Sequence, residues 1–261
     1  MKTRYVFLSL FVATVLGAIA ATFLGASEPL PPTNAAADAD TLPIDKAANA
    51  QIKPGDWKQW GGTSYRNNTP IGENIPTIWN IGDFDRKTGE WIADDAENIK
   101  WVSRVGSQTY GNPVIADGRL FVGTNNGAGY LKRYPADVDL GCLVCFNEED
   151  GKFLWQHSSE KLPTGRVHDW PLQGICCAPL VEGDRLWFVT SRGEVACLDA
   201  EGFDDDENDG PTRSEISTTK EEADVIWTFD MMKQLGVSQH NMASCSVTAW
   251  GDLLLVNTSN G

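Results

Sequence analysis

A repeated pattern constrains the fold of this chain more than any other feature of its sequence. Three segments share one plan without gaps: PVIADGRLFVGTNNG (113–127), PLVEGDRLWFVTSRG (179–193) and VTAWGDLLLVNTSNG (247–261). In each copy two short apolar runs flank a turn that contains Gly and Asp, and the second run ends in a polar turn closed by Gly. Each copy therefore predicts a strand, a hairpin turn, a second strand and a further turn.

The first two copies continue into a second pair of apolar runs. These runs lie at 141–157 in the first unit, and at 193–202 and 224–231 in the second. Each unit therefore predicts four strands, and the polar stretches between them predict loops. Four-stranded antiparallel units in tandem bury their faces either by radial stacking, as a β-propeller, or by linear stacking, as a solenoid.

The tryptophans favour the propeller. Trp101, Trp155 and Trp227 fall near the end of the fourth-strand pattern of successive units. A large flat side chain at this place can pack between neighbouring blades. The predicted fold class is therefore all-β, a β-propeller of four-stranded antiparallel blades.

Two kinds of segment carry a resemblance to a known family. The stretch DWKQWGGTSYRNNTP (56–70), and units of the type GRLFVGTNNG followed by LVCFNEEDGKFLWQH, resemble the propeller repeats named after pyrroloquinoline quinone (PQQ). That superfamily includes the quinoprotein alcohol dehydrogenases and a propeller lipoprotein of outer-membrane β-barrel assembly, and many of its members bind no quinone. The resemblance covers residues 56–261. We interpret them as an incomplete propeller of about two and a half blades, the N-terminal fragment of a longer protein.

The N-terminus predicts export. Lys2 and Arg4 precede an apolar run at 5–26, which is typical of a signal sequence. The small residues at 18–20 suit cleavage, yet the run is also long enough to remain as a membrane anchor, so 1–26 is a signal peptide or a signal anchor. Residues 27–55 are rich in Pro, Ala and Asp and predict a disordered linker. The expected location is the periplasm, or the membrane with the propeller facing the periplasm.

Charge narrows the class of partner. The formal net charge is -15 and the sequence pI is about 4.5. A phosphate backbone would be repelled by such a chain, so no nucleic-acid partner is expected. Envelope proteins or a small-molecule ligand are the expected partners.

Four of the six cysteines occupy repeat positions. Cys177 and Cys245 both stand two residues ahead of an aligned first strand, and Cys145 matches Cys197 inside a blade. Cysteine behaves at such places as a small buried hydrophobic residue. Cys142 and Cys145 also form a CxxC motif, but a c-type haem site would need His in place of the following Phe, and no second pair with zinc spacing follows.

Cys176 directly precedes the repeat position Cys177, so the two form a pair of adjacent cysteines. In an oxidising compartment the two could close a strained disulfide ring. In PQQ-dependent alcohol dehydrogenases such a ring lies against the quinone, so the resemblance implies that this pair binds a cofactor near the propeller axis, with PQQ and calcium as the possible cofactors. The alternative is that adjacent residues of a strand face opposite ways, one thiol packing in its blade and the other facing a neighbour. The resemblance also requires an acidic residue where this chain has Tyr110-Gly111-Asn112.

Two further features, an acidic run and a histidine in a loop, have both a functional and a purely structural interpretation. The acidic run at 198–211 resembles a calcium-binding loop that starts at Asp205, because Asp209 and Gly210 then occupy the fifth and sixth positions of the loop. Ile216, however, stands where such a loop requires a bidentate Glu. The run is therefore better interpreted as a solvated acidic insertion. His168 lies beside Asp169 ahead of the cysteine pair and is either an acid or base at the mouth of a channel or part of a polar loop. No residue is assigned a catalytic or metal-binding role.

Two functional classes follow from these features. One is an exported propeller that acts as a binding or scaffold module in the cell envelope. The alternative is a PQQ- and calcium-dependent quinoprotein oxidoreductase, in which the cofactor would carry the chemistry.

Overall fold

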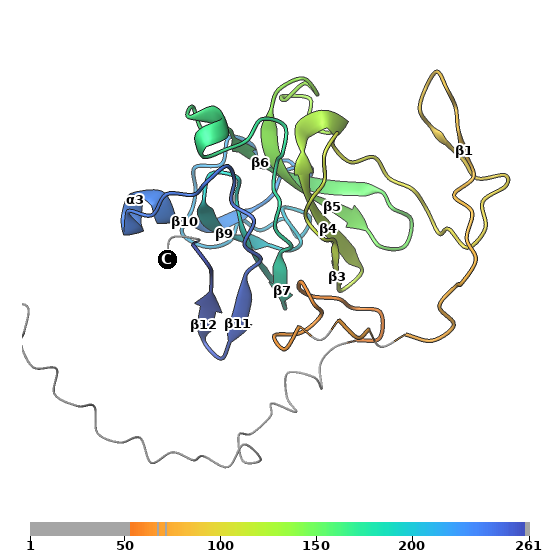
Figure 1. Ribbon diagram of the computed structural model, residues 1–261, viewed down its shortest axis with the longest axis horizontal. Helices are drawn as coiled ribbons and strands as arrows, with labels where there is room; N and C mark the ends of the chain where they lie inside the picture. Colours follow the sequence, from red (N-terminus) through yellow and green to blue (C-terminus); the bar gives the residue numbers. More distant parts are fainter. Residues whose placement is uncertain (1–52, 67, 71, 259–261) are drawn as a thin grey trace, which may run out of the picture. The chain divides into compact units, whose positions relative to one another are not determined.

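The computed structural model describes residues 53–66, 68–70 and 72–258 (Figure 1). All of them fall in one of the two units into which the chain divides, Ala47–Gly261. The predicted signal segment at 1–26 and nearly all of the predicted linker at 27–55 lie outside the described residues. No helix among the residues described has the length and apolar character needed to cross a membrane.

The first repeat unit folds as one four-stranded antiparallel sheet, here called the first sheet. Its strands pair in chain order and are β3 (Val114–Ala116), β4 (Arg119–Asn125), β5 (Leu140–Asn147) and β6 (Phe153–Glu160). Asp117 and Gly118 join β3 to β4 with φ of 49° and 80°. Positive φ at both central residues is what a type I′ hairpin requires, so this turn follows from its sequence.

The second repeat unit forms an equivalent second sheet. Its strands also pair in chain order and are β7 (Leu180–Glu182), β8 (Arg185–Val189), β9 (Glu194–Asp199) and β10 (Val225–Asp230). The predicted fourth strand ends one residue early, because Met231 begins the short helix α3 (Met231–Leu235). Asp230 caps this helix by accepting a hydrogen bond from the backbone N–H of Lys233, 2.9 Å away.

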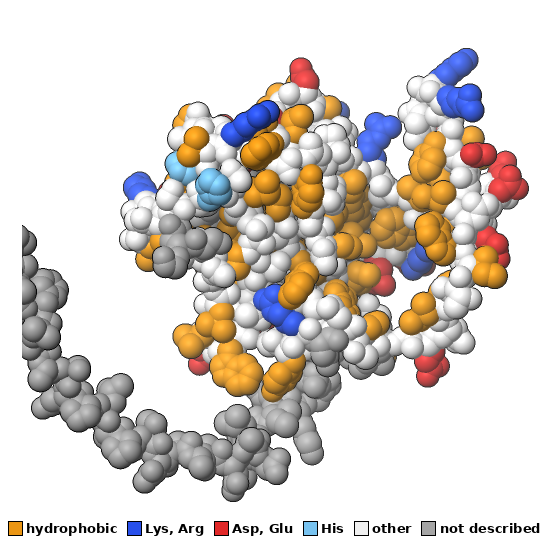
Figure 2. Space-filling view, viewed as in Figure 1, with side chains coloured by type: hydrophobic (Ala, Val, Ile, Leu, Met, Phe, Trp, Pro, Cys, Tyr) orange, Lys and Arg blue, Asp and Glu red, His pale blue; other side chains and the backbone are white. Residues whose placement is uncertain are grey.

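The third copy forms the hairpin of β11 (Thr248–Trp250) and β12 (Leu253–Leu255). Trp250 and Leu253 of this hairpin are exposed. Figure 2 shows hydrophobic side chains on the surface of this part of the molecule. A second hairpin that the repeat did not predict joins β1 (Asp83–Phe84) to β2 (Trp91–Ile92), and two 3₁₀ turns lie at Asn126–Ala128 (η1) and Gly165–Val167 (η2). The described chain is therefore all-β and antiparallel, as predicted. Its sheets are compatible with successive propeller blades, and the closed ring and its number of blades stay predictions.

The two four-stranded sheets share one hydrophobic core. A single cluster of buried side chains includes Phe121, Leu143 and Trp155 from the first sheet, and Leu186 and Phe188 from the second. Each sheet therefore buries a face against the other, which neither could do alone.

Tryptophan side chains pack and form hydrogen bonds between successive units. Trp155 of β6 donates its indole N–H to the carbonyl of Ala200, 3.2 Å away in the second sheet's loop. Gly202 (φ 65°) lies beneath the same indole, where a Cβ would come within 2.8 Å of the ring. The predicted packing of Trp155 between units is therefore confirmed.

Trp101 makes the equivalent contact one unit earlier. Its indole N–H donates to the carbonyl of Glu148 at 2.8 Å, and a Cβ on Gly151 (φ 71°) would come within 2.5 Å of the ring. Trp101 itself lies outside the strands. Its predicted packing is confirmed, whereas its predicted place near the end of a strand is not.

The long insertion of the second unit covers the edge of the first sheet. The backbone N–H of Gln156 in β6 donates to the carbonyl of Glu221 (2.9 Å), and that of Ala223 donates to the carbonyl of Gln156 (3.2 Å). Arg133 adds a bidentate ion pair with Glu222, in which Nη2 and Oε2 are 2.7 Å apart. The insertion thereby protects an edge strand that would otherwise expose unpaired backbone groups.

Candidate functional site

The segment that carries Cys176 and Cys177 lies where the two sheets meet. The backbone N–H of Ile175 donates to the carbonyl of Thr124 in β4, 3.1 Å away. A Cβ added to Gly123 would come within 2.4 Å of the Ile175 carbonyl oxygen. The two backbones are therefore in direct contact, and only glycine leaves room for this approach.

The residues that lead into the three first strands, here called the approach segments, are 108–112, 174–178 and 242–246. Gly111 and Cys177 are repeat-equivalent, and a Cβ on Gly111 would come within 2.6 Å of the Cys177 carbonyl oxygen. Ala178 donates its backbone N–H to the hydroxyl of its equivalent Ser246 at 3.0 Å. Residues that are far apart in sequence but share a repeat position therefore lie next to one another.

Cys177 points into its own sheet and is fully buried. Its thiol lies 3.2 Å from the carbonyl oxygen of Val189 in β8, and the Val189 backbone N–H donates back to Sγ at 3.4 Å. Burial raises the pKa of Cys177 to about 12, so the group is a protonated thiol at neutral pH. Cys177 is thus a packing residue with a satisfied S–H group.

Cys176 has different partners. Its Sγ lies 3.3 Å from Sδ of Met242, in the third approach segment, and only 8% of the residue is exposed. Burial raises its pKa to about 11, and nearby Lys161 opposes this rise. The Cys177 thiol faces a strand of its own sheet, and the Cys176 thiol faces the third approach segment. Adjacent side chains of an extended chain point to opposite sides, so this difference is expected. Both are free thiols in this structure.

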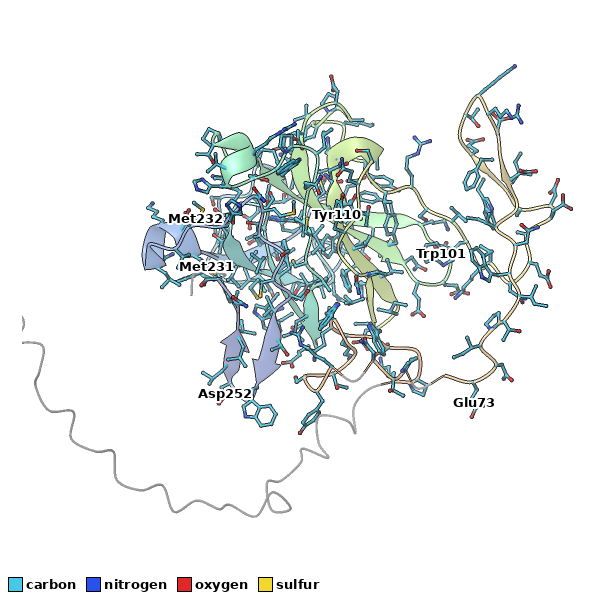
Figure 3. The ribbon with its side chains drawn as sticks, in the orientation of Figure 1. Glu73, Trp101, Tyr110, Met231, Met232 and Asp252 are labelled. Atoms are coloured by element: carbon cyan, nitrogen blue, oxygen red, sulfur yellow. The ribbon has the colours of Figure 1, made fainter. Side chains whose placement is uncertain are left out.

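A small cavity adjoins Met242. Its volume is about 140 Å³. The residues that line it come from both sides of the β8–β9 turn, from α3 and the segment after it, from the third approach segment and from the residues after β12: Val189, Gly193, Met231, Met232, Val237, Gln239, His240, Met242, Ala243, Ser244, Cys245, Asn257 and Thr258. Met231 and Met232 are labelled at α3 in Figure 3. Four of the lining residues carry sulfur, one is a histidine and none has a carboxylate.

His168 is engaged on both ring nitrogens. Nδ1 lies 3.1 Å from the hydroxyl of Thr164, and Nε2 lies 2.9 Å from the hydroxyl of Ser238. The adjacent Asp169 is buried and forms an ion pair with Lys161. These contacts fasten the loop to the segment ahead of the third copy, which agrees with the interpretation of 166–173 as a structural polar loop.

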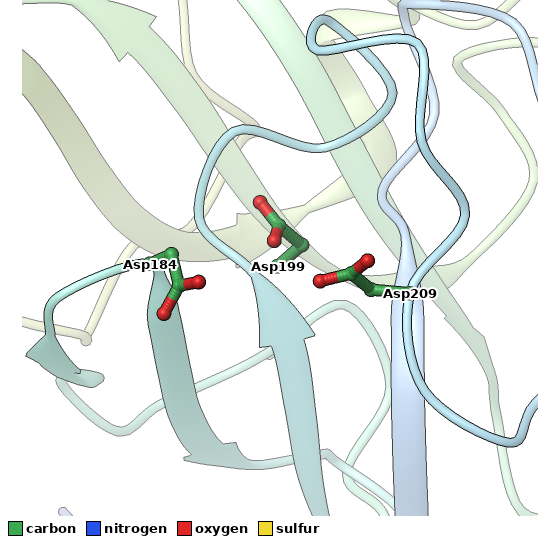
Figure 4. A group of neighbouring side chains, drawn as sticks. All are labelled: Asp184, Asp199 and Asp209. Carbon is green, nitrogen blue, oxygen red and sulfur yellow. The ribbon is translucent and has the colours of Figure 1, made fainter.

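Three carboxylates surround one arginine of the second sheet: Asp184 lies in the β7–β8 turn, Asp199 ends β9, and Asp209 lies in the insertion that follows. Asp184, Asp199 and Asp209 point toward one another, with ligand atoms within 4.8 Å (Figure 4). The Arg185 guanidinium lies among them, with N to O distances of 2.8 Å to Asp199, 2.7 Å to Asp209 and 3.1 Å to Asp184. Its charge-assisted hydrogen bonds neutralise part of the cluster without a metal ion. Ile216, at the place where a calcium loop needs Glu, is 80% exposed.

The CxxC motif is divided between two clusters. Cys145 belongs to the core that the two sheets share, whereas Cys142 packs with Val122 and Val144 on the other face of β5. Residues three apart on a strand point to opposite faces, so these thiols cannot bind one ion together. Cys145 and Cys197 are both buried, as predicted for small hydrophobic residues at this repeat position.

Sequence reasoning missed the methionines. Met242 occupies the same repeat position as Gly174, so comparison of the repeats does not single it out as a functional residue. The sequence did offer one indication, because three of the chain's four methionines lie close together, between 231 and 242. Only the packing of the approach segments brings one of them against Cys176.

Neither protein-family models nor curated proteins match this chain. The likeness to PQQ-type repeats therefore depends on the sequence motifs and on the two equivalent sheets.

Proposed function

We propose that this chain is an exported PQQ-like β-propeller that acts as a binding or scaffold module in the cell envelope. The observation that carries the proposal is the meeting of the three approach segments beside two sheets of one plan. In a propeller, the loops at one end of stacked blades gather into a composite surface that is suited to binding. The acidic charge of the chain suits protein or small-molecule partners better than nucleic acid.

The side chains at this junction support binding more than catalysis. Cys176 and Cys177 are buried, protonated thiols, and His168 uses both ring nitrogens in structural contacts. Tyr110, the repeat-equivalent of Cys176, is 58% exposed and presents an amphipathic ring to solvent. A partner would therefore meet an exposed aromatic anchor near this junction.

The quinoprotein alternative is favoured by the position of the cysteine pair at the meeting of the approach segments. The residues present do not fit a quinone, however. Met242 and Val189 contact the two sulfur atoms, which leaves 8% of Cys176 and none of Cys177 exposed to a planar ring. Residues 110–112 supply no carboxylate for calcium. We therefore assign no catalytic step to this chain.

The proposal is tested by site-specific crosslinking in cells. A photoreactive amino acid at Tyr110 should capture a discrete envelope protein, whereas the same group at Ile216, which is 80% exposed in the long insertion of the second unit, should not. Equal capture at both positions, or none at either, would contradict a binding site near the approach segments. Cell fractionation of the same sample checks export.

The enzyme alternative is tested on the purified chain without residues 1–26. PQQ and calcium are titrated while tryptophan fluorescence and the mass of the native protein are followed. We expect no stoichiometric complex. A complex that weakens in Cys176→Ser and Cys177→Ser would replace the scaffold proposal with the quinoprotein one.

A further inference from the structure

We infer that Cys176 and Met242, with a third sulfur ligand from the adjoining cavity, form a binding site for a soft monovalent metal ion, Cu(I). This inference goes beyond the proposed function and does not depend on it. It is carried by the contact of the Cys176 thiol with the Met242 thioether, and by the other sulfur-containing residues that line the cavity beside Met242.

Met242 links the Cys176 thiol to a cavity whose lining includes other sulfur-containing residues. Cys176 Sγ and Met242 Sδ are 3.3 Å apart, and Met242 lines the cavity of about 140 Å³. Met231, Met232 and Cys245 line the same cavity. A small movement of flexible thioether side chains would let two or three sulfurs bind one ion.

The ligand types select the metal. Thiolate and thioether sulfurs are soft donors that favour Cu(I). Calcium and magnesium require oxygen ligands, and the cavity lining has no carboxylate. Zinc is usually held by four thiolate, imidazole or carboxylate ligands. His240 and Cys245 also line the cavity, but the sulfur contact on which the site is built joins one thiol, Cys176, to a neutral thioether, Met242, and thioether sulfur favours Cu(I) over zinc. Cu(I) is therefore the ion that this donor set fits best.

The binding step balances without a redox partner. The Cys176 thiol gives its proton to water as the S–Cu bond forms, while Met242 donates a lone pair and stays neutral. Copper enters and remains as Cu(I). One thiolate and one monovalent cation make a neutral unit, so a buried position does not carry an unpaired charge. Because each bound ion releases one proton, apparent affinity should rise with pH.

The affinity measurement uses the reduced chain without residues 1–26, under anaerobic conditions. Cu(I) is supplied as its coloured complex with bicinchoninate, and loss of colour reports transfer to the protein. Native mass spectrometry gives the stoichiometry, which we expect to be one ion per chain. X-ray absorption of the loaded protein should show a first shell of sulfur.

Three variants assign the ligands. Met242→Leu and Cys176→Ser should each weaken Cu(I) binding by about tenfold or more. Cys197→Ala removes a buried thiol of β9 outside the cavity and should bind like the parent. Met242→Leu conserves side-chain volume and should fold, which circular dichroism checks.

Three results would overturn the site. These are folded wild-type protein that takes up no Cu(I), Met242→Leu that binds with parental affinity, or a first shell dominated by nitrogen or oxygen. Any of them would make the methionines and Cys176 plain packing residues. None of them bears on the crosslinking or PQQ experiments, so failure of the copper site is distinguishable from failure of the proposed function.

Discussion

At the scale of single residues, burial decides what each polar side chain can do. Cys176 and Cys177 are adjacent in sequence but have different neighbours, and burial raises the pKa of both thiols. Asp199 is another case: burial, the first cause, raises its pKa to about 6, and the nearby Arg185 opposes this rise. The raised pKa shows that the guanidinium only partly offsets the cost of burying the carboxylate.

Asp199 should make the protein less stable as the pH rises from about 4 to about 6. In this window the folded state holds a proton on Asp199 that the unfolded state has lost, so the unfolding free energy falls with pH. Asp199→Asn should reduce this fall by up to about 1.4 kcal/mol per pH unit. Urea unfolding at several pH values measures it. Asp184→Asn, at an exposed carboxylate of the same cluster, is the control, and an unchanged slope in Asp199→Asn would contradict the assignment.

At the scale of elements, an indole and a glycine join neighbouring units. Trp101 and Trp155 each donate to a carbonyl that follows the third strand of the next unit, and a glycine with positive φ lies beneath each ring. Two reasons require glycine at this position: its φ is positive, which side chains disfavour, and a Cβ would overlap the indole ring. This contact sets the distance between one sheet and the next.

Gly202→Ala should therefore destabilise the protein more than Gly183→Ala. Both glycines have positive φ, 65° and 60°, but a Cβ on Gly183 would meet nothing within 4 Å, whereas one on Gly202 would come within 2.8 Å of Trp155. The matched pair separates backbone strain from the clash with the ring, and we expect a difference of about 1–3 kcal/mol. Thermal or urea unfolding measures it, and equal losses would show that the indole does not constrain this position.

At the scale of the whole molecule, the shared core predicts that the two sheets unfold together. Phe188 of β8 is fully buried in the cluster that also contains Phe121 and Trp155 of the first sheet. Cooperative units of this kind lose hydrogen-exchange protection as one. The sheets are thus one folding unit made of two repeats.

Phe188→Leu should lower the protection of amides in β5 and β9 by the same free energy, about 1–2 kcal/mol, because it removes apolar contact from a core that both sheets use. Native-state hydrogen exchange resolves the two strands. Ile216→Ala, at an exposed position, should change neither. Loss of protection confined to β9 would mean that the sheets unfold independently.

Local sequence determined the strands of this protein and most of its turns. Strand alternation and the Gly and Asp turns act over a few residues, so the repeat predicted both four-stranded sheets and the hairpin of the third copy. Repeat arithmetic also predicted buried Cys145 and Cys197 and the packing role of Trp155. The hairpin of β1 and β2 was missed because each of its strands has only two residues and carries no alternation.

Only the tertiary structure decided which approach segments touch. The contact of Cys176 with Met242, the enclosure of Arg185 by carboxylates and the cover of β6 by the long insertion of the second unit all join residues from separate segments. Such contacts depend on how whole sheets stack and where insertions return, and the free energy for them comes from burying the shared core. The sequence by itself therefore determined what each unit is, and the stacking of the units decided which sulfur atoms surround the cavity.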